Sequence, residues 1–246
     1  MADIIEGRHA VHEALVSGMP AVRVLLADGA RPGEAVDEIL SAARAAGVPV
    51  AHVSRSVLDK MSVRGAHQGA MAEVRPFAFV PLEEVIAAAA NEPSALIIAL
   101  DHVLDPQNLG AVVRSAEVVG ARAVLVPKKR TAAIGPAAFK ASAGAIAHTP
   151  IVREPNLVRA LVRLQEAGWW IAGASEAAPD TVWDAPMEGR IVLVMGSEES
   201  GLARLTAETC DFLVRLPVAG RVGSLNVAQA ATALAFEWVR RGRTGR

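Results

Sequence analysis

The sequence Leu213-Val-Arg-Leu-Pro-Val-Ala-Gly-Arg-Val-Gly-Ser-Leu-Asn-Val227 predicts, in this order, a short strand, a glycine-containing loop and the start of a helix. Pro217 ends the strand because its nitrogen carries no hydrogen to donate across a sheet. Ser224 or Asn226 can cap the helix, whose apolar residues recur at helical spacing, and Gly242 is expected to end it. Backbone N–H groups at such a helix start can bind a small polar ligand, but an ordinary turn has the same pattern.

The composition is that of an ordinary globular protein. The chain has 246 residues, 52% hydrophobic and 21% charged, enough for one large domain or two smaller ones. Its one cysteine, Cys210, excludes an internal disulfide framework and a multi-cysteine zinc site, and a lone cysteine is most often a small buried residue. No apolar run is long enough to span a membrane, and residues 1–7 lack the features of a secretory signal. We therefore expect a cytoplasmic protein that binds neither membrane nor metal.

Charge is spread unevenly along the chain. The net charge of −1 argues against a strongly basic nucleic-acid-binding protein. Between Val118 and Arg153, however, the sequence has six basic residues and no acidic one, so this segment is where a polyanion would bind. The run Lys128-Lys129-Arg130 is either a solvated loop or an RNA contact, and its composition does not decide between the two.

The order of the predicted elements indicates two α/β domains. Residues 1–75 alternate short strands and helices, and Pro76 and Pro81 then mark a linker, residues 76–94, with one acidic helix. Over residues 95–246, the expected strands include 95–100, 123–126, 169–174 and 191–195, and the expected helices include 108–119, 137–147 and 156–166. Near-continuous apolar strands that alternate with helices are typical of a parallel sheet covered on both faces.

Two further polar loops follow apolar strands, at the edge where the sites of α/β sheets lie. Asp105-Pro-Gln-Asn108-Leu-Gly110 precedes Arg114, which could grip a phosphate, although a helix cap at Asn108 and a surface position for Arg114 would explain the same residues. Met195-Gly-Ser-Glu198-Glu-Ser-Gly201 lacks the Gly-Lys-Ser/Thr end of a nucleoside-triphosphate loop. Its two adjacent acids would repel a triphosphate and attract a cation such as a sulfonium.

Together, the three loops resemble the SpoU/TrmH family of SPOUT methyltransferases, most nearly the subgroup that methylates the ribose 2′-hydroxyl of a guanosine in 23S rRNA. The resemblance covers nearly the whole chain. Its motifs are Asp105-Pro-x-Asn-x-Gly-x-x-x-Arg114, Gly196-x-Glu-x-x-Gly-Leu202 and Pro217-x-x-Gly-x-x-x-Ser-Leu-Asn-Val227. Two departures are mild: Gly223 stands where close relatives often have serine, and Ala228-Gln229 where Ser-Val is usual.

The resemblance implies an enzyme that transfers a methyl group from S-adenosylmethionine (AdoMet) to RNA. It implies a trefoil-knotted domain with a mostly parallel sheet, which binds AdoMet in the knot, preceded by a small ribosomal-protein-like domain that binds RNA. The cofactor-binding residues implied are Met195, Gly196, Gly201, Leu216, Gly220 and Leu225, and the catalytic residues are Asn108, Arg114, Glu198, Ser224 and Asn226. Candidate RNA contacts in the first domain are Arg8, Arg64, His67 and Gln68. The family also implies a homodimer with the site completed across the interface, which the several apolar sides of the last helix would suit.

Arg114 has two candidate roles under this resemblance. The family proposal makes it the base that takes the hydroxyl proton, whereas a permanently charged guanidinium is better suited to clamp the RNA phosphate while phosphate or water accepts the proton. Alternative functions are methylation of tRNA, methylation of another rRNA site, and a non-catalytic RNA-binding factor in ribosome assembly. The intact catalytic set argues against the non-catalytic factor, which would not need these residues together.

Overall fold

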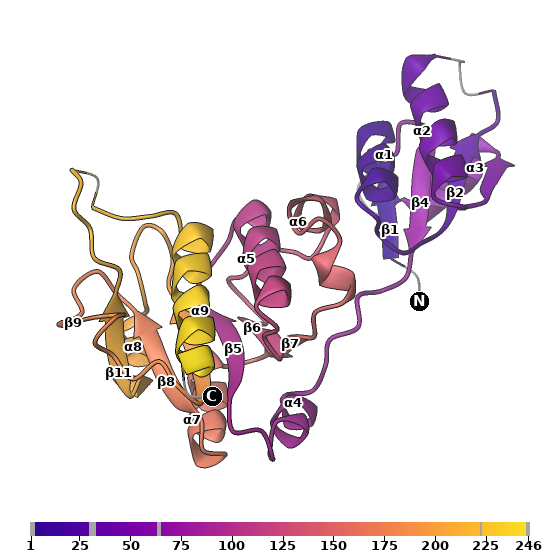
Figure 1. Ribbon diagram of the computed structural model, residues 1–246. Helices are drawn as coiled ribbons and strands as arrows, with labels where there is room; N and C mark the ends of the chain where they lie inside the picture. The colour runs from indigo at the N-terminus through magenta and orange to yellow at the C-terminus, as the bar shows by residue number, and fades with distance from the viewer. Residues whose placement is uncertain (1–2, 30–32, 63–64, 222, 245–246) are drawn as a thin grey trace. The chain divides into compact units, whose positions relative to one another are not determined.

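The protein folds into two units, each built around its own β-sheet (Figure 1). A computed structural model describes residues 3–29, 33–62, 65–221 and 223–244. The first unit comprises residues up to 78 and 134–144, and the second comprises 79–133 and 145 onward. The domain bounds expected from the sequence stay a prediction.

The first unit has a four-stranded mixed sheet in the order β1-β4-β2-β3. β4 runs antiparallel to β1 and β2, and β3 runs parallel to β2. The elements are β1 (Asp3–Glu6), α1 (Arg8–Val16), β2 (Ala21–Ala27), α2 (Glu34–Ala45), β3 (Val50–Val53), α3 (Arg55–Met61), β4 (Ala70–Val74) and α6 (Pro136–Ala141). Alternate residues of β2 reach opposite faces: Val24 and Leu26 pack with α1 and α2, and Leu25 packs with Leu58 of α3.

The second unit contains a seven-stranded sheet in the order β7-β6-β5-β10-β8-β11-β9, in which neighbouring strands run parallel. Its strands are β5 (Ala95–Leu100), β6 (Ala123–Pro127), β7 (Ile151–Glu154), β8 (Trp170–Ala174), β9 (Asp180–Thr181), β10 (Arg190–Met195) and β11 (Phe212–Arg215). Its helices are α4 (Leu82–Ala88), α5 (Pro106–Val118), the 3-10 turn η1 (Ala145–Ala147), α7 (Leu157–Glu166), α8 (Arg204–Thr209) and α9 (Val227–Thr244). The parallel sheet that the sequence predicts is confirmed.

Helices cover both faces of this sheet (Figure 1). Ile97 and Ala99 of β5 face a core cluster to which α7 and α4 contribute, the latter with Leu82. Leu96 and Ile98 are also fully buried and point to the other face, where α5 and α9 pack against each other and against the strands. The acidic helix expected in the linker is α4, and its apolar side belongs to this core.

Several elements differ from the expectation. The helix expected over 137–147 is broken between α6 and η1, because Ala143 and Gly144 have left-handed φ angles of 50° and 87°, which a right-handed helix cannot contain. Gly242 does not end α9, which continues to Thr244 with helical geometry. The strands β1 and β9 were not expected, since four and two residues are too few for a clear hydrophobic pattern.

The lone cysteine packs against the second sheet. Cys210 is partly buried, and its thiol donates a hydrogen bond to the Thr206 carbonyl oxygen at 3.2 Å. A Cβ atom added at Gly173 of β8 would lie 2.7 Å from its sulfur. Burial raises the pKa of the Cys210 thiol to about 12, so the thiolate that would act as a nucleophile is scarce near neutral pH.

The described part of the chain contains neither a candidate metal site nor a candidate membrane-spanning helix. No group of three or more His, Cys, Asp or Glu residues there is placed to hold a metal ion. No helix among the described residues is long and apolar enough to cross a membrane.

An ion-pair cluster around the buried Glu237 of α9 makes the free energy of unfolding depend on pH in the acidic range. The Glu237 side chain is 8% exposed, and its carboxylate accepts hydrogen bonds from Arg240 at 2.7 Å and from Arg241 at 2.9 Å. The bonds from Arg240 in particular lower the pKa of Glu237 to about 2, although burial opposes them. We expect the free energy of unfolding to fall as pH drops from about 4.5 toward 2, because the unfolded glutamate takes up a proton in this range and the folded one does not.

Urea unfolding measured from neutral pH down to about pH 2.5 tests this expectation. The control is Glu237→Gln, which keeps the shape of the side chain and cannot titrate. It should be less stable than the wild type at pH 7, and the difference should shrink through the same acidic window. A difference between the two proteins that is equal at every pH would contradict the assignment.

Candidate active site

Three side chains from separate segments meet at the carboxyl edge of the second sheet: the first turn of α5, the loop after β10 and the residue before α9. The Asn108 Nδ2 atom donates to Glu198 Oε1 at 3.1 Å. The Asn226 Nδ2 atom donates to Asn108 Oδ1 at 2.9 Å and to Glu198 Oε1 at 2.5 Å. We call Asn108, Glu198 and Asn226 the amide–carboxylate cluster. All three were expected as catalytic residues, and the structure brings them together.

Local backbone geometry fixes the two asparagines. Asp105 caps α5 with its carboxylate, which accepts from the Gln107 and Asn108 backbone nitrogens at 3.1 Å and 3.3 Å. Asn108 therefore does not serve as the cap, and its amide is available to the cluster. Asn226 caps α9 through Oδ1, which accepts from the Ala228 nitrogen at 2.9 Å, while its Nδ2 atom turns to the cluster.

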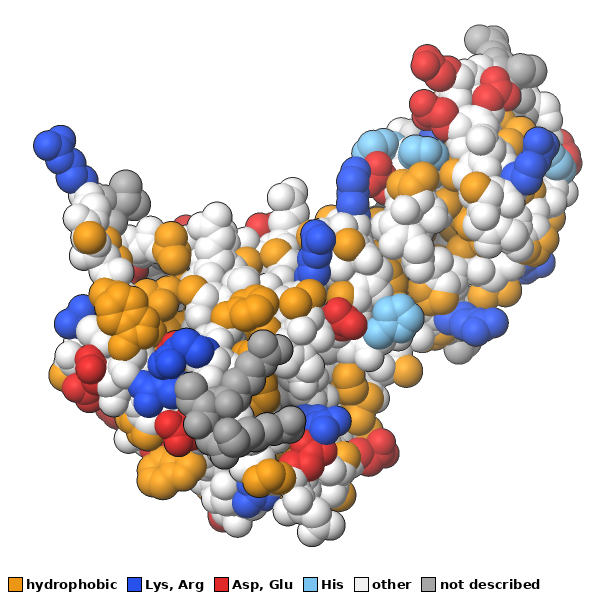
Figure 2. All heavy atoms as spheres, viewed as in Figure 1, with side chains coloured by type: hydrophobic (Ala, Val, Ile, Leu, Met, Phe, Trp, Pro, Cys, Tyr) orange, Lys and Arg blue, Asp and Glu red, His pale blue; other side chains and the backbone are white. Residues whose placement is uncertain are grey.

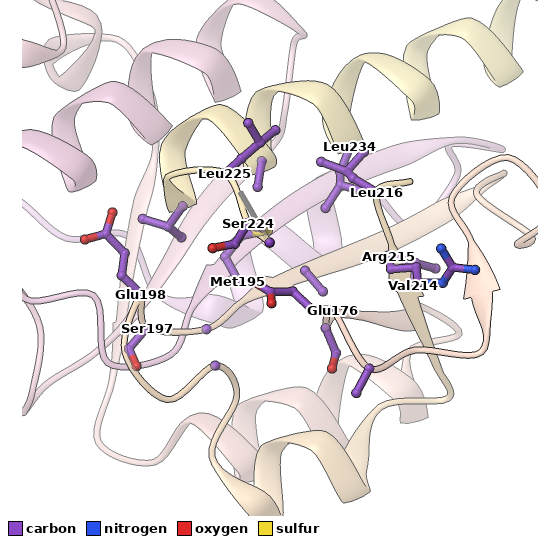
Figure 3. A pocket seen from close by; sticks show the side chains of 18 of the residues that line it. Glu176, Met195, Ser197, Glu198, Val214, Arg215, Leu216, Ser224, Leu225 and Leu234 are labelled. Atoms are coloured by element: carbon purple, nitrogen blue, oxygen red, sulfur yellow. The ribbon is translucent and has the colours of Figure 1, made fainter. Parts of the chain in front are cut away.

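A cavity of about 680 Å³ adjoins the cluster, and Glu198 belongs to both (Figure 3). Five of the six expected cofactor-binding residues line it, namely Met195, Gly196, Gly201, Leu216 and Leu225. The sixth, Gly220, is not among the described residues that do so. Ser224 also lines the cavity, and in Figure 3 Leu216, Leu225 and Leu234 lie along one side of it, with Glu198 at one end.

The cavity wall formed by the loop after β10 depends on close backbone approach. The Ser197 and Gly201 backbones exchange two hydrogen bonds of 3.0 Å, which fold the loop back on itself. Gly201 has a left-handed φ of 64°, and a Cβ atom at Gly196 would lie 2.2 Å from the Gly201 carbonyl carbon. Only glycine at 196 permits this approach.

The cavity carries an excess of negative charge. Glu176, Glu198 and Glu199 line it. Among the described residues, the one basic residue in the lining is Arg215, whose Nε atom donates to the Ala178 carbonyl oxygen at 3.1 Å. Apolar walls with a few carboxylates favour a ligand that has an apolar body and a positive charge.

Sequence reasoning missed the segment Ala174–Ala177, which contributes Ser175 and Glu176 to the cavity. This segment matches no motif. Its position directly after β8, at the carboxyl end of a strand in a parallel sheet, is the one signal that could have found it.

Family comparisons decide the nature of this site. The SpoU rRNA Methylase family matches residues 95–236, and the description RNA 2′-O ribose methyltransferase substrate binding matches residues 4–80. The chain belongs to the SpoU methylase family. It is 39% identical over 245 residues to the 23S rRNA (guanosine-2′-O-)-methyltransferase RlmB of Pseudomonas putida, with 98% of each chain covered. It is 38% identical over 242 residues to an uncharacterized tRNA/rRNA methyltransferase of Mycobacterium ulcerans, over 98% of this chain and 78% of the other.

A solved SpoU structure agrees with this assignment. The methyltransferase AviRb from Streptomyces viridochromogenes, in complex with AdoMet, aligns with a TM-score of 0.67 and 25% identity over 100% of this chain and 92% of its own. This SpoU methylase is therefore an AdoMet-dependent RNA 2′-O-methyltransferase, with a substrate-binding unit before the methylase domain. The glycine-formed wall, the apolar side and the acidic rim of the cavity fit a sulfonium cofactor.

Arg114 does not join the cluster in this SpoU methylase. It is exposed on α5, and among the described residues it makes no hydrogen bond or ion pair and lines no part of the cavity. The neighbouring Ser115 instead bonds Thr232 of α9 through the two hydroxyl oxygens at 2.6 Å. Arg114 thus lies on the exposed side of α5, outside the amide–carboxylate cluster.

The candidate RNA-contacting residues of the first unit differ in how exposed their side chains are. His67 is 4% exposed; its Nδ1 atom accepts from the Gly69 nitrogen at 3.0 Å, and its Nε2 atom pairs with Asp59 at 2.8 Å. Both ring nitrogens are therefore used inside the unit. Arg8 and Gln68 are at the surface or near it, joined by a 3.1 Å bond from Arg8 Nε to the Gln68 carbonyl oxygen. Arg64 lies outside the described residues.

Proposed function

We propose that this SpoU methylase modifies the 2′-hydroxyl of a guanosine in 23S rRNA. The observation that carries the proposal is the amide–carboxylate cluster at the end of the cavity, where a ribose can meet the cofactor. The identity to RlmB, 39% over 98% of both chains, supports the choice of target, because it spans the substrate-binding unit as well as the methylase domain.

The cluster suits a positioning role. When bound, AdoMet supplies an activated methyl group for the ribose oxygen, and an in-line transfer of this kind depends mainly on alignment. Asn108 and Asn226 hold the Glu198 carboxylate through its Oε1 atom, which leaves Oε2 to accept a hydrogen bond from the ribose hydroxyl. Ser224, in the loop that leads to Asn226, lies where it can help to orient the same ribose.

We assign Arg114 to the phosphate of the target nucleotide. Arginine is not deprotonated in proteins, so it is better suited to stabilise the developing negative charge than to take the proton, which phosphate or water accepts. Because Arg114 lies outside its own cluster, we propose that it completes the site of a second protomer.

A homodimer of this kind would pack α5 and α9 against their copies. Figure 2 displays hydrophobic side chains exposed over the face that carries these helices. Val118 of α5 is 61% exposed, Phe236 of α9 48%, and Leu225 before α9 50%.

We also propose that the polar loops around the cavity form the trefoil knot, that the first unit is the RNA-binding domain, and that the enzyme works in the cytoplasm.

A second target is favoured by one observation. The relative from Mycobacterium ulcerans is named for tRNA as well as rRNA, so tRNA is the alternative substrate. A non-catalytic assembly factor is disfavoured, because such a protein has no use for a carboxylate held by two amides beside a cofactor cavity.

Transfer of tritiated methyl groups from AdoMet to 23S rRNA that lacks its own modification tests the proposal. Arg114→Ala is run beside the wild type, with Arg204→Ala as the matched control, since Arg204 is an exposed arginine that pairs with Glu208 on α8. We expect label on one guanosine ribose, absent with Arg114→Ala and unchanged with Arg204→Ala. Label on tRNA alone would identify tRNA as the substrate. Full activity of Arg114→Lys would contradict bidentate binding of a phosphate by Arg114.

A further inference from the structure

The basic segment between Val118 and Arg153 resolves into paired and unpaired charges. Arg122 forms an ion pair with Glu92, Lys140 pairs with Glu13 at 2.9 Å, and Arg153 lies 3.8 Å from the centre of the Phe79 ring. The other three basic residues are the exposed run Lys128–Arg130 after β6. Among the described residues no carboxylate pairs with any of the three. Among the described residues, the run is thus the part of the segment's positive charge that neither pairs with a carboxylate nor stacks on an aromatic ring.

One member of the run is held in place by a chain of hydrogen bonds. The Arg130 Nη1 atom lies 3.2 Å from His102 Nε2, and His102 Nδ1 lies 2.5 Å from Asp101 Oδ1. Because a guanidinium only donates, Nε2 accepts and the Nδ1 hydrogen is directed to Asp101. Asp101 is 2% exposed, and its Oδ2 atom accepts from the Ala203 nitrogen at 2.8 Å. This series of hydrogen bonds therefore connects the surface residue Arg130 to the buried carboxylate of Asp101.

Both surface members of this chain have unfavourable backbone conformations. His102 has a φ of 63° and Arg130 a φ of 58°. These values lie in the left-handed region, which residues other than glycine rarely adopt. Such conformations persist where the surroundings hold them, and they concentrate at ligand clamps and active sites. The bond between His102 and Arg130, both in this conformation, therefore indicates that the run is held for binding and is not an ordinary solvated loop.

The sheet order places this run on one side of the amide–carboxylate cluster. β6 lies next to β5, and β5 leads through Asp101 and His102 to α5 with Asn108. The cavity lies on the other side of β5, at the ends of β10, β8 and β11. A nucleotide whose ribose is at the cluster therefore has the cofactor cavity on one side and the basic run on the other.

We propose that Lys128, Lys129 and Arg130 bind the phosphates of the RNA strand beside the target nucleotide, and that His102 is a positioning residue that holds Arg130 for this contact. One N–H group of the guanidinium bonds His102, and the remaining donors can grip phosphate oxygens. The inference rests on the proposed function, because it requires an RNA substrate at the cluster.

The first test measures RNA binding against salt. A 23S rRNA transcript is titrated at several KCl concentrations with the wild type and with the triple variant Lys128→Ala, Lys129→Ala, Arg130→Gly. Glycine is used at 130 because it accepts the left-handed backbone without strain. We expect the magnitude of the slope of log affinity against log salt to fall by about 2 to 3, since each of the three lost phosphate contacts removes roughly 0.7–0.9. An unchanged slope and affinity would overturn the proposal.

The second test separates His102 from Arg130. His102→Gly and Arg130→Gly should each weaken binding of the transcript about twofold to fivefold, as expected for an exposed charged contact, and the double variant should be no weaker than Arg130→Gly alone. The KM for RNA should rise while kcat and AdoMet affinity stay unchanged. Effects that multiply in the double variant would overturn the positioning role. Loss of AdoMet binding in His102→Gly would also overturn it, by assigning the residue to the fold of the loop after β10.

These results are separable from the proposed function. A wild-type enzyme that binds the transcript with the expected salt slope but transfers no label to 23S rRNA contradicts the target, not the phosphate contact. A wild-type enzyme that labels 23S rRNA, with a triple variant that binds it equally well, contradicts the contact alone.

Discussion

Replacement of Gly196 by alanine is expected to abolish AdoMet binding and to lower the free energy of unfolding by about 1–3 kcal/mol, the usual cost of an overpacked interior position. The added Cβ would lie 2.2 Å from the Gly201 carbonyl carbon, 2.4 Å from the Leu202 nitrogen and 2.5 Å from the Gly201 oxygen. All three atoms belong to the backbone, so no side chain can turn aside. The loop held by the Ser197–Gly201 pair must move, and with it one wall of the cavity.

Isothermal titration of AdoMet and urea unfolding of the same preparation measure the two effects separately. Gly220→Ala is the matched control. Among the described residues other than its chain neighbours, none has an atom within 4 Å of the added Cβ, and Gly220 is not one of those that line the cavity. That variant should bind AdoMet like the wild type. If Gly196→Ala bound AdoMet with unchanged affinity, the cavity would not be the cofactor site.

Replacement of Asn226 by aspartate is expected to lower kcat by about 100-fold while AdoMet binding and stability are retained. The cap on α9 survives, because an aspartate oxygen can still accept from the Ala228 nitrogen. The hydrogen bonds that Asn226 donates to Asn108 and Glu198 are lost. In the wild type the Asn226 Nδ2 atom lies 2.5 Å from Glu198 Oε1, and in the variant a carboxylate oxygen takes its place, so two negative charges face each other. Loss of a preorganised hydrogen-bond donor of this kind commonly costs about 10²–10³ in rate.

Steady-state methyl transfer at saturating RNA and AdoMet measures kcat, and helix content and unfolding report whether the fold is intact. Asn226→Ser serves as a control that can still cap the helix but brings no negative charge, and it should lose less activity than the aspartate variant. Equal activity of Asn226→Asp and the wild type would remove the cluster from the mechanism.

Asn226→Asp also offers a test of the shared site. A heterodimer of one Asn226→Asp chain and one Arg114→Ala chain, purified through two different tags, has one site with both wild-type residues if Arg114 acts on the partner. It should regain about half of the wild-type activity, because a two-fold dimer has two equivalent sites. An inactive heterodimer would place Arg114 in the site of its own protomer.

The parts of the fold predicted from the sequence are those that local pattern determines. β5 spans Ala95–Leu100 as expected, because six consecutive apolar residues are fully buried between two helical layers. The parallel arrangement follows from the alternation of such strands with helices. The resemblance implied Asn108, Glu198 and Asn226 as catalytic residues, and the hydrogen bonds that join their side chains were not predicted.

The parts that could not be predicted depend on contacts between distant segments. The place of β10 between β5 and β8 is set by backbone pairing, which carries no side-chain signature. Glu176 reaches the cavity only because β8 lies near β10 and β11 in that order. The left-handed backbone at Ala143 gives no signal in the sequence, since alanine does not favour it.

The strand order has a consequence for how the enzyme is made. β5 leaves the ribosome well before β10, its central neighbour, and the cluster needs residues from α5, from the loop after β10 and from the start of α9. A nascent chain can complete the sheet of residues 3–74 early, but its methylase half must wait with exposed apolar strands until α9 has been synthesised. Pairings between distant strands form slowly and leave a chain open to aggregation. We therefore expect this enzyme to depend on chaperones during synthesis and to refold slowly from denaturant, with cofactor binding the last property to return.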